Sequence, residues 1–312
     1  GADIDVVAVN DLGSIDTMAH LLQYDSVLGR FPQKVTSTKS SIRAGRETIK
    51  VLSERNPADL PWGDLGVDVV IESTGFFNNR EAASAHLEGG APLVIVSAPC
   101  SNADATFVYG VNHKDFRVSK DKVISNASCT TNCFVPMVKV LDDAFGLTQG
   151  LMTTIHSYTG DQNLVDGPHG DLRRARGAAI NIVPTSTGAA RATSLVMESM
   201  KGKLDGTALR VPTPTGSLTD FTANLKKAAS VEDINAAFAA AAKKELKGVL
   251  KYTEDPIVSS DIVTDPHSCV FDAGLTMSMG KMVKINGWYD NEWGYSNRLV
   301  DLTMFTGSKV KR

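Results

Sequence analysis

The sequence predicts an α/β fold, with a doubly wound parallel sheet in the first part of the chain and an α+β domain with a mostly antiparallel sheet in the second part. One observation is a set of short apolar runs, typical of strands buried on both faces, at Val6–Val9, Val67–Val70 and Pro92–Ser97. Another is that helical stretches lie between these runs, at Ser14–Gln23 and Asn78–Glu88. Strands that alternate with helices are typical of a parallel sheet.

The other elements follow from similar patterns. Lys34–Val51 is rich in β-branched and charged residues and predicts hairpin-like strands. Thr130–Phe145 predicts a helix of about four turns, which Gly146 ends. Further strands are expected at residues 151–156, 207–211, 219–224, 258–262 and 282–288, and further helices at residues 187–200, 231–245 and 296–306. The stretch 157–181 reads as a long loop, which in a compact domain is usually functional or disordered.

Length, charge and cysteine content narrow the class of protein. The chain has 312 residues, enough for two domains, and its net charge of −3 argues against a dedicated nucleic-acid surface. Its apolar runs are too short to span a bilayer, and its first residues show no secretory signal. Four cysteines do not form a disulfide framework, so we expect a reduced, cytoplasmic protein. From the charge and the short apolar runs we expect no nucleic-acid or membrane partner.

The stretch SNASCTTNC, residues 125–133, places a thiol among small polar side chains at the start of the predicted helix. A helix N-terminus favours an anion, so the pKa of Cys129 is expected to be lowered and its sulfur to be nucleophilic. Free cysteines are also often buried in cores, and position alone leaves both interpretations of Cys129 open. Cys133 lies one turn deeper in the helix, and for it we expect structural burial.

A nucleophilic thiol needs a base, and histidine suits this role because its pKa is near neutral. His156 ends the apolar strand LMTTIH, which delivers it to the rim of a sheet. The other five histidines lie in predicted helices or polar loops and are expected to face solvent: His20, His86, His113, His169 and His267. His156 is therefore the candidate base.

Several features suggest that anions bind near this pair. Ser157, Tyr158 and Thr159 follow His156 directly. The long loop after them carries three arginines, Arg173, Arg174 and Arg176. Thr187 and Gly188 precede a helix, where hydroxyls and amides can hold a phosphate, and Arg210 lies in a strand-like stretch. Each feature alone is common, but together they favour an anion site.

Five motifs, SNASCTTNC, TIHSYTGDQ, PTSTGAA, LRVPTPTGS and WYDNEWGYSNR, resemble the phosphorylating glyceraldehyde-3-phosphate dehydrogenase family in order and spacing. The resemblance covers essentially the whole chain. It implies oxidation of glyceraldehyde 3-phosphate to 1,3-bisphosphoglycerate with NAD and inorganic phosphate, through a thiohemiacetal and a thioester on a cysteine.

The resemblance also assigns roles to residues. Cys129 matches the family's nucleophile and His156 its base. The positions that hold the substrate phosphate and the attacking phosphate are matched by Ser128, Thr130, Thr159, Arg174, Thr187, Gly188 and Arg210. The cofactor positions are matched by Asn10, Asp11, Arg55, Thr74, Ser97, Asn291 and Tyr295. Asp11, which would repel a 2′-phosphate, and Pro168 both favour NAD over NADP, and no metal is implied.

The same resemblance implies a domain division and an assembly. Residues 1–128 would form the NAD-binding domain, completed by a C-terminal helix at residues 292–312, and residues 129–291 the catalytic domain. The implied assembly is a homotetramer that acts on glyceraldehyde 3-phosphate and inorganic phosphate.

One family feature is expected to be lacking. The sequence contains no G-x-G-x-x-G pattern, and its start corresponds to the second strand of a dinucleotide-binding Rossmann-like fold. We therefore expect that the first strand, the glycine-rich turn and the first helix are missing, and that the chain alone binds NAD poorly. Three alternatives stay open: an erythrose-4-phosphate dehydrogenase, a cofactor-deficient truncated homologue, and a Cys-His hydrolase.

Overall fold

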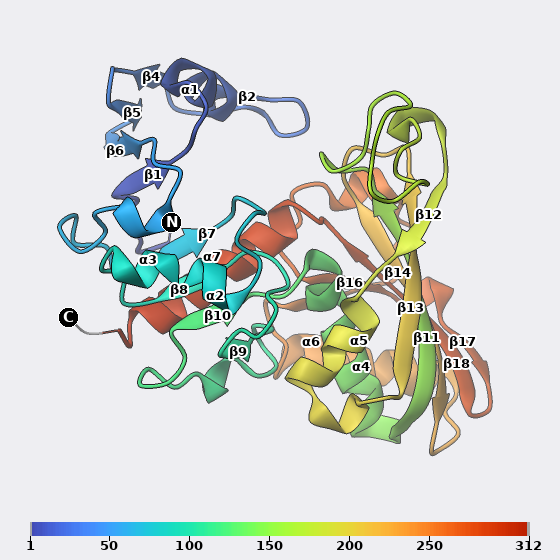
Figure 1. Cartoon of the computed structure of the whole chain (residues 1–312). Coiled ribbons are helices and arrows are strands. Elements are labelled where there is room, and N and C mark those ends of the chain that lie inside the picture. Colours follow the sequence, from blue (N-terminus) through green and yellow to red (C-terminus); the bar gives the residue numbers. More distant parts are fainter. Residues whose placement is uncertain (1, 311–312) are drawn as a thin grey trace. The chain divides into compact units, whose positions relative to one another are not determined.

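The computed structural model describes residues 2–310, which form two compact units (Figure 1). The first unit comprises residues 2–105, 116–125 and 302–310, and the second comprises residues 106–115 and 126–301. The last helix, α7 (Trp293–Gly307), runs along the chain from the second unit into the first. The domain division expected from the sequence stays a prediction.

The first unit has the predicted parallel strand pairs, but they are divided between two main sheets, and the strands of residues 35–52 pair antiparallel as the expected hairpins. One sheet has the order β1 (Ala8–Asn10), β6 (Glu47–Leu52), β5 (Ser41–Ala44) and β4 (Val35–Ser37), with β1 and β6 parallel. The other has the order β7 (Val70–Glu72), β8 (Val94–Val96), β10 (Val123–Ser125) and β9 (Ala105–Thr106), with the first three parallel. Within residues 2–310, β1 and β7 are therefore edge strands.

Short helices accompany these sheets. Helix α1 (Ile15–Gln23) begins at the predicted cap, where the Ser14 hydroxyl accepts a hydrogen bond from the Thr17 amide at 3.1 Å. It is followed by a small hairpin of β2 (Tyr24–Asp25) and β3 (Gly29–Arg30). Two single-turn helices, α2 (Arg80–Ala83) and α3 (Ala85–Glu88), replace the one helix predicted there.

The second unit contains one eight-stranded sheet that is mostly antiparallel, as predicted. Its order is β12 (Val183–Ser186), β13 (Leu204–Val211), β11 (Leu147–Ser157), β14 (Ser217–Leu225), β18 (Met282–Tyr289), β16 (Cys269–Asp272) and β15 (Leu250–Thr253), and β17 (Met277–Met279) also pairs with β18. Only β11 with β13, and β15 with β16, are parallel among its described pairs.

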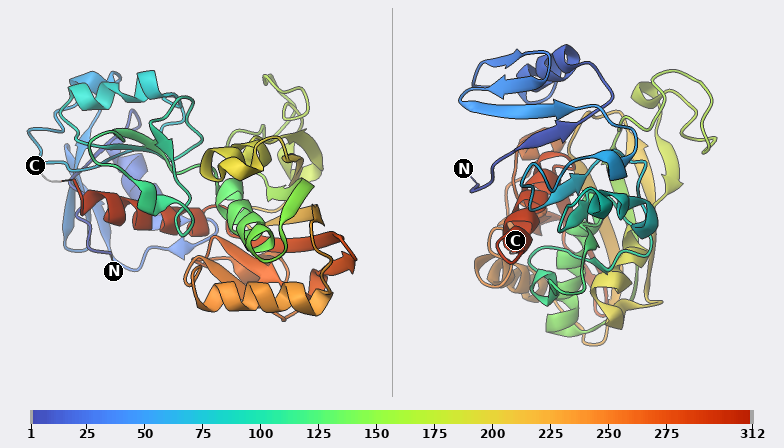
Figure 2. Two further views of the ribbon diagram at one scale, coloured as in Figure 1. Left: turned by 90° about the horizontal axis from the view of Figure 1, so that it is seen from below. Right: turned by 60° about the vertical axis from the view of Figure 1, so that its left-hand side comes forward.

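Three helices cover one face of this sheet (Figures 1 and 2). They are α4 (Cys129–Phe145), α5 (Ala189–Val196) and α6 (Val231–Lys243). The core between sheet and helices includes the edge-on pair Phe134 and Phe221 and the stacked pair Phe238 and Phe271. Gly146 ends α4 with a φ of 70°, a backbone conformation that favours glycine.

Short 3₁₀ helices complete the chain, at Pro57–Asp59, His113–Asp115, Ala178–Ile180, Glu198–Met200, Ser259–Ile262 and Ala273–Leu275. The strand predicted at residues 258–262 is wrong, because the Asp261 carboxylate accepts a hydrogen bond from the Val258 amide at 2.8 Å and favours a helical turn. The helix predicted at residues 187–200 is broken at Met197. No helix within residues 2–310 has the length and apolarity to cross a bilayer.

Candidate active site

Three elements of the second unit bring the predicted thiol, base and arginine together. The parallel register of β11 and β13 places His156 directly beside Arg210. Cys129 is the first residue of α4, and the hydroxyl of the preceding Ser128 caps the helix by accepting a hydrogen bond from the Thr131 amide at 3.0 Å. The order of the strands and the position of the helix cap therefore determine the geometry of this cluster.

The Cys129 sulfur lies 3.5 Å from Nε2 of His156. The other ring nitrogen of His156, Nδ1, lies 2.7 Å from the Ser157 carbonyl oxygen, which can only accept a hydrogen bond. Nδ1 also lies 3.1 Å from Nη1 of Arg210, which can only donate, but this nitrogen has the Ser157 carbonyl oxygen and the Thr159 hydroxyl as acceptors. The shorter contact to the carbonyl oxygen favours the tautomer with the proton on Nδ1, and the lone pair of Nε2 then faces the thiol. This is the tautomer that a base needs in order to take a proton from sulfur.

The expectation of a lowered thiol pKa is wrong. Burial raises the pKa of Cys129, and the hydroxyl and amide of Thr130 and the charge of Arg210 oppose this effect without cancelling it. Burial and the nearby Arg210 lower the pKa of His156 to about 4. At neutral pH the pair is thus a thiol beside a neutral imidazole, and the helix N-terminus alone does not produce a free thiolate.

Arg210 has hydrogen-bonding capacity that its neighbours do not fill. One terminal nitrogen, Nη1, lies 3.1 Å from the Ser157 carbonyl oxygen, 3.1 Å from His156 Nδ1 and 3.2 Å from the Thr159 hydroxyl. Its Nε is buried and has no hydrogen-bond partner within residues 2–310. A buried guanidinium with an unused donor is suited to an anion.

Arg174, the second predicted arginine, already has carboxylate partners. Its Nη1 lies 2.5 Å from the Asp161 carboxylate, and its Nε lies 3.7 Å from that of Asp171 and donates to the Thr185 hydroxyl at 3.0 Å. Thr159 also donates to Asp161. Burial alone would raise the pKa of Asp161, but the Thr159 hydrogen bond and the charges of Arg210 and Arg174 hold it below its usual value.

The other predicted phosphate residues make local contacts. The Thr130 hydroxyl shares a hydrogen bond of 2.8 Å with the Tyr289 hydroxyl, which also contacts the Thr154 hydroxyl at 2.7 Å. The Thr187 hydroxyl accepts from the Ala189 amide at 3.2 Å, and the exposed Gly188 caps α5. Tyr289 was not predicted as part of this cluster, although it lies in the motif WYDNEWGYSNR.

Asn291 and Tyr295 follow β18 in the same unit. Asn291 is only 7% exposed, and its amide oxygen accepts a hydrogen bond from the Ser157 hydroxyl at 2.8 Å. Tyr295 donates to the Ala127 carbonyl oxygen at 3.0 Å, and thereby holds the turn that precedes Cys129. Ser157, expected with Tyr158 and Thr159 near a bound anion, is fully buried and uses its hydroxyl for this contact with Asn291.

The remaining predicted cofactor residues lie in the first unit, after the strands β1, β6, β7 and β8. These strands form two parallel pairs in separate sheets. Asn10 ends β1 and makes two hydrogen bonds with the Glu54 backbone, of 2.9 and 2.8 Å. The exposed Asp11 accepts from the Gly13 amide at 2.7 Å, and Arg55, just after β6, is exposed as well. The carboxyl ends of parallel strands are where such sheets bind ligands.

Thr74 and Ser97 follow β7 and β8, and a buried network supports the first of them. The Thr74 amide donates to the Glu72 carboxylate at 2.7 Å, while Glu72 also contacts Nε2 of His86 at 2.8 Å. Burial would raise the pKa of Glu72, but hydrogen bonds from His86 and Thr74 lower it. The Ser97 hydroxyl donates to that of Ser73 at 3.0 Å.

Two histidines are more buried than the sequence predicted. His86 is 5% exposed and His113 9%, whereas both were expected to face solvent. The prediction is wrong because helical periodicity in such short segments gives no reliable buried face. His20 is exposed as expected, and His169 and His267 are half-buried.

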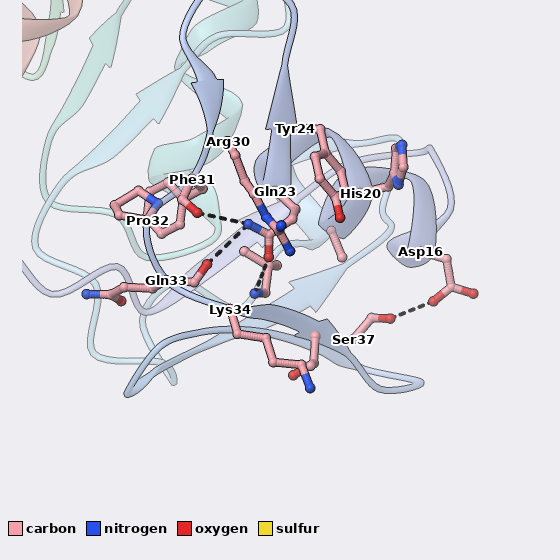
Figure 3. A pocket seen from close by; sticks show the side chains of 13 residues that line it. Asp16, His20, Gln23, Tyr24, Arg30, Phe31, Pro32, Gln33, Lys34 and Ser37 are labelled. Atoms are coloured by element: carbon pink, nitrogen blue, oxygen red, sulfur yellow. Dashed lines mark hydrogen bonds between the residues drawn. The ribbon is translucent and has the colours of Figure 1, made fainter.

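A pocket of about 760 Å³ lies elsewhere in the first unit (Figure 3). It is formed by α1 and the segment after it, and Gln23 stands at its centre with hydrogen bonds to the Phe31 and Gln33 carbonyl oxygens at 3.0 and 3.2 Å. None of the predicted site residues lines it. No group of three or more potential metal-ligating side chains is found within residues 2–310.

Comparisons with known proteins match both units. Residues 128–291 match the family model of the glyceraldehyde 3-phosphate dehydrogenase C-terminal domain, and residues 1–80 that of its NAD-binding domain. The chain is 63% identical over 311 residues to a glyceraldehyde-3-phosphate dehydrogenase of Mycobacterium avium, covering 99% of this chain and 91% of that protein. It is 60% identical over 311 residues to glyceraldehyde-3-phosphate dehydrogenase 2 of Streptomyces avermitilis, covering 99% of this chain and 93% of that protein. Because the NAD-binding match begins at residue 1, the expected lack of a glycine-rich segment is not confirmed.

Proposed function

The chain belongs to the glyceraldehyde-3-phosphate dehydrogenase family, and we propose how its residues share the family's reaction. That reaction oxidises glyceraldehyde 3-phosphate to 1,3-bisphosphoglycerate, with NAD as cofactor and inorganic phosphate as second substrate. The contacts of Cys129, His156 and Arg210 support these roles.

Cys129 is the nucleophile and His156 the base. As the sulfur attacks the aldehyde carbon, Nε2 of His156 takes the thiol proton and passes it to the carbonyl oxygen, which gives a thiohemiacetal and frees Nε2 again. Nε2 next takes the hydroxyl proton of this adduct as its carbon loses a hydride, which leaves a thioester. A phosphate oxygen then forms the new bond to the acyl carbon and the carbon–sulfur bond breaks. Nε2 returns its proton to the departing sulfur, which restores the thiol of Cys129 and the neutral imidazole.

Arg210 is the main anion-binding side chain of the second unit. Its buried, unpartnered Nε and the nearby Thr159 hydroxyl offer donors to a phosphate oxygen. Arg174 contributes less, because Asp161 already balances its charge. The cap of α4 and the turn before α5 supply further hydroxyls and amides, from Ser128, Thr130, Thr187 and Gly188.

Each unit, taken by itself, offers residues that fit one part of NAD. Asp11 has a free carboxylate edge for ribose hydroxyls, and Asn10, Arg55, Thr74 and Ser97 lie at the same type of strand end. Asn291 offers an amide for the nicotinamide carboxamide, with Tyr295 close by in sequence. When bound, NAD accepts the hydride, and the exposed carboxylate of Asp11 disfavours the 2′-phosphate of NADP.

We infer a cytoplasmic homotetramer. The second unit exposes large apolar side chains, which are often covered in oligomers, at Leu151 (69%), Leu172 (83%), Ile180 (85%) and Ile182 (66%). Light scattering of the purified chain should give the mass of four copies, and the mass of a single chain would contradict the inference.

The observation that carries the mechanism is the 3.5 Å approach of the Cys129 sulfur to Nε2 of His156. Purified protein should form NADH over many turnovers only when glyceraldehyde 3-phosphate, NAD and phosphate are all present, and about one NADH per site when phosphate is left out. Its kcat/KM should be lower for erythrose 4-phosphate. Iodoacetamide should label Cys129 before the other three thiols and stop turnover, because Cys129 is half-buried with His156 beside it to take its proton, whereas the others are buried. Continued turnover by the labelled protein would rule out this mechanism.

A further inference from the structure

The amide oxygen of Asn291 is surrounded by hydrogen-bond donors. It accepts from the Ser157 hydroxyl at 2.8 Å, the Ser217 hydroxyl at 3.0 Å and the Gly216 amide at 3.2 Å. Ser157 and Ser217 are fully buried, so water does not compete for these hydrogen bonds. The pairing of β14 with both β11 and β18 brings these segments together.

The identity of these donors fixes which way the amide points. The Gly216 N–H can only donate, so a flipped amide would set two N–H groups against each other. The Ser217 oxygen already accepts from the Ser157 amide at 3.1 Å, which leaves its own proton for Asn291. The oxygen therefore occupies this position, and the NH₂ group points away from these donors.

The amide nitrogen of Asn291 is left available for a ligand. It has no hydrogen-bond partner within residues 2–310, and it is not among the fully buried atoms that lack one. The backbone is also fixed, because the neighbouring Asp290 is 2% exposed and its carboxylate accepts from the Thr264, Glu292 and Trp293 amides at 2.9, 3.0 and 2.9 Å. The result is a rigid donor on a buried support.

We propose that Ser157 and Ser217 are positioning residues that, with the Gly216 amide, hold Asn291 so that its NH₂ group donates to the carbonyl oxygen of the nicotinamide carboxamide. This inference rests on the proposed function. Ser157 also joins this support to the catalytic strand, because it follows His156 directly.

A double-mutant cycle on the full chain tests the support, with the Kd for NAD measured by calorimetry. Ser157→Ala and Ser217→Ala should each raise Kd by ~2–10-fold, and Asn291→Ala by ~10–100-fold. Adding Ser157→Ala to Asn291→Ala should raise Kd no further, because the amide that Ser157 positions is gone. Additive effects would overturn the proposal.

A buried serine of the same unit provides the control. Ser268 is 3% exposed, and its hydroxyl has no partner among the described residues. Ser268→Ala should leave the Kd for NAD unchanged. A rise like that of Ser157→Ala would mean that the serines act only through general stability, and would overturn the proposal.

Asn291→Asp tests the orientation without depending on the serine variants. The acceptor oxygen is retained for Ser157, Ser217 and the Gly216 amide, but the new negative charge lies beside the buried Asp290 carboxylate. The melting temperature should therefore fall, and Kd is measured well below it. The second carboxylate oxygen replaces NH₂ and repels a carbonyl, so Kd should rise at least as much as in Asn291→Ala. NAD binding at wild-type strength by this variant would overturn the proposal.

Kinetics separate this role from catalysis. For Ser217→Ala we expect KM for NAD to rise while kcat at saturating NAD is retained, because the contact is equal in ground and transition states. A fall in kcat alone would place the serines in support of His156 instead and overturn the proposal. A wild-type chain that binds no NAD would overturn the proposed function as well. If the wild type binds NAD but the Ser157→Ala and Asn291→Ala effects on Kd add, only this inference would be overturned.

Discussion

His156 in the second unit and His86 in the first are buried to the same extent, each 5% exposed, yet their hydrogen bonds differ. Both ring nitrogens of His86 have strong partners, since Nδ1 accepts from the Trp62 indole at 3.0 Å and Nε2 donates to Glu72 at 2.8 Å. In His156, one nitrogen is fixed by a carbonyl oxygen and the other faces a thiol at 3.5 Å. A buried histidine that is complete in its contacts stabilises the fold, whereas one with a nitrogen facing a nucleophile can move a proton.

The largest effect is expected from removing the group that His156 faces. Cys129→Ser should lower the rate of NADH formation by ~10⁴-fold or more, because a hydroxyl is a poorer nucleophile and its ester is less reactive than a thioester. Circular dichroism and melting temperature should be unchanged. Cys100→Ser, at a thiol of the first unit, is the control and should keep its activity. Substantial turnover by Cys129→Ser would contradict the assignment.

Replacing His156 should affect catalysis, whereas replacing His86 should affect stability. His156→Asn should lower kcat by ~10²–10⁴-fold, the usual value of acid–base assistance, with little change in stability. His86→Asn should instead lower the free energy of unfolding by ~2–4 kcal/mol, because buried Glu72 and Trp62 groups lose their partner. Its kcat at saturating NAD should be retained. Steady-state kinetics give the kcat of both variants, and urea unfolding gives their free energies of unfolding. Equal losses of kcat in the two variants would contradict the different roles of the two histidines.

Much of the fold was predictable because local signals agree with it. Ser14 caps α1, Gly146 ends α4, and β8 lies inside its predicted apolar run. Short strands such as β10 and β12 were missed, because three or four residues carry too little periodicity. The division of the first unit into two sheets depends on long-range pairing, which no local pattern encodes.

The candidate site was only partly predictable for the same reason. A thiol before a helix and a histidine at a strand end are visible in the sequence, so Cys129 and His156 could be paired. The position of Arg210 beside His156 depends on the register of β11 and β13. The raised pKa of Cys129 depends on how deeply the start of α4 is buried. The effect of this burial on the pKa is larger than the lowering expected from the helix N-terminus.

The pH dependence of stability should also distinguish the catalytic histidine. The pKa of His156 is lowered from 6.5 to about 4 in the folded chain, so the unfolded chain binds more protons between these pH values. Stability therefore falls as the pH is lowered from about 6.5 to about 4, by at most ~3 kcal/mol from this residue. Urea unfolding at several pH values should show a shallower acid loss in His156→Asn than in the wild type. If the free energy of unfolding falls equally with pH in the two proteins, the lowered pKa of His156 is contradicted.

The smallest expected effect concerns the charge beside His156. Arg210 lowers the pKa of His156 more than Arg174 does, because Arg210 contacts the ring and Arg174 is more distant and paired with Asp161. Arg210→Gln should therefore raise the pKa of His156, and Arg174→Gln should raise it less. NMR titration of ring-labelled histidine, with His156→Asn to assign the signal, measures both shifts. If the two variants shift the signal equally, the strand neighbour has no special influence on the base, and the contrast with His86 then depends on the thiol alone.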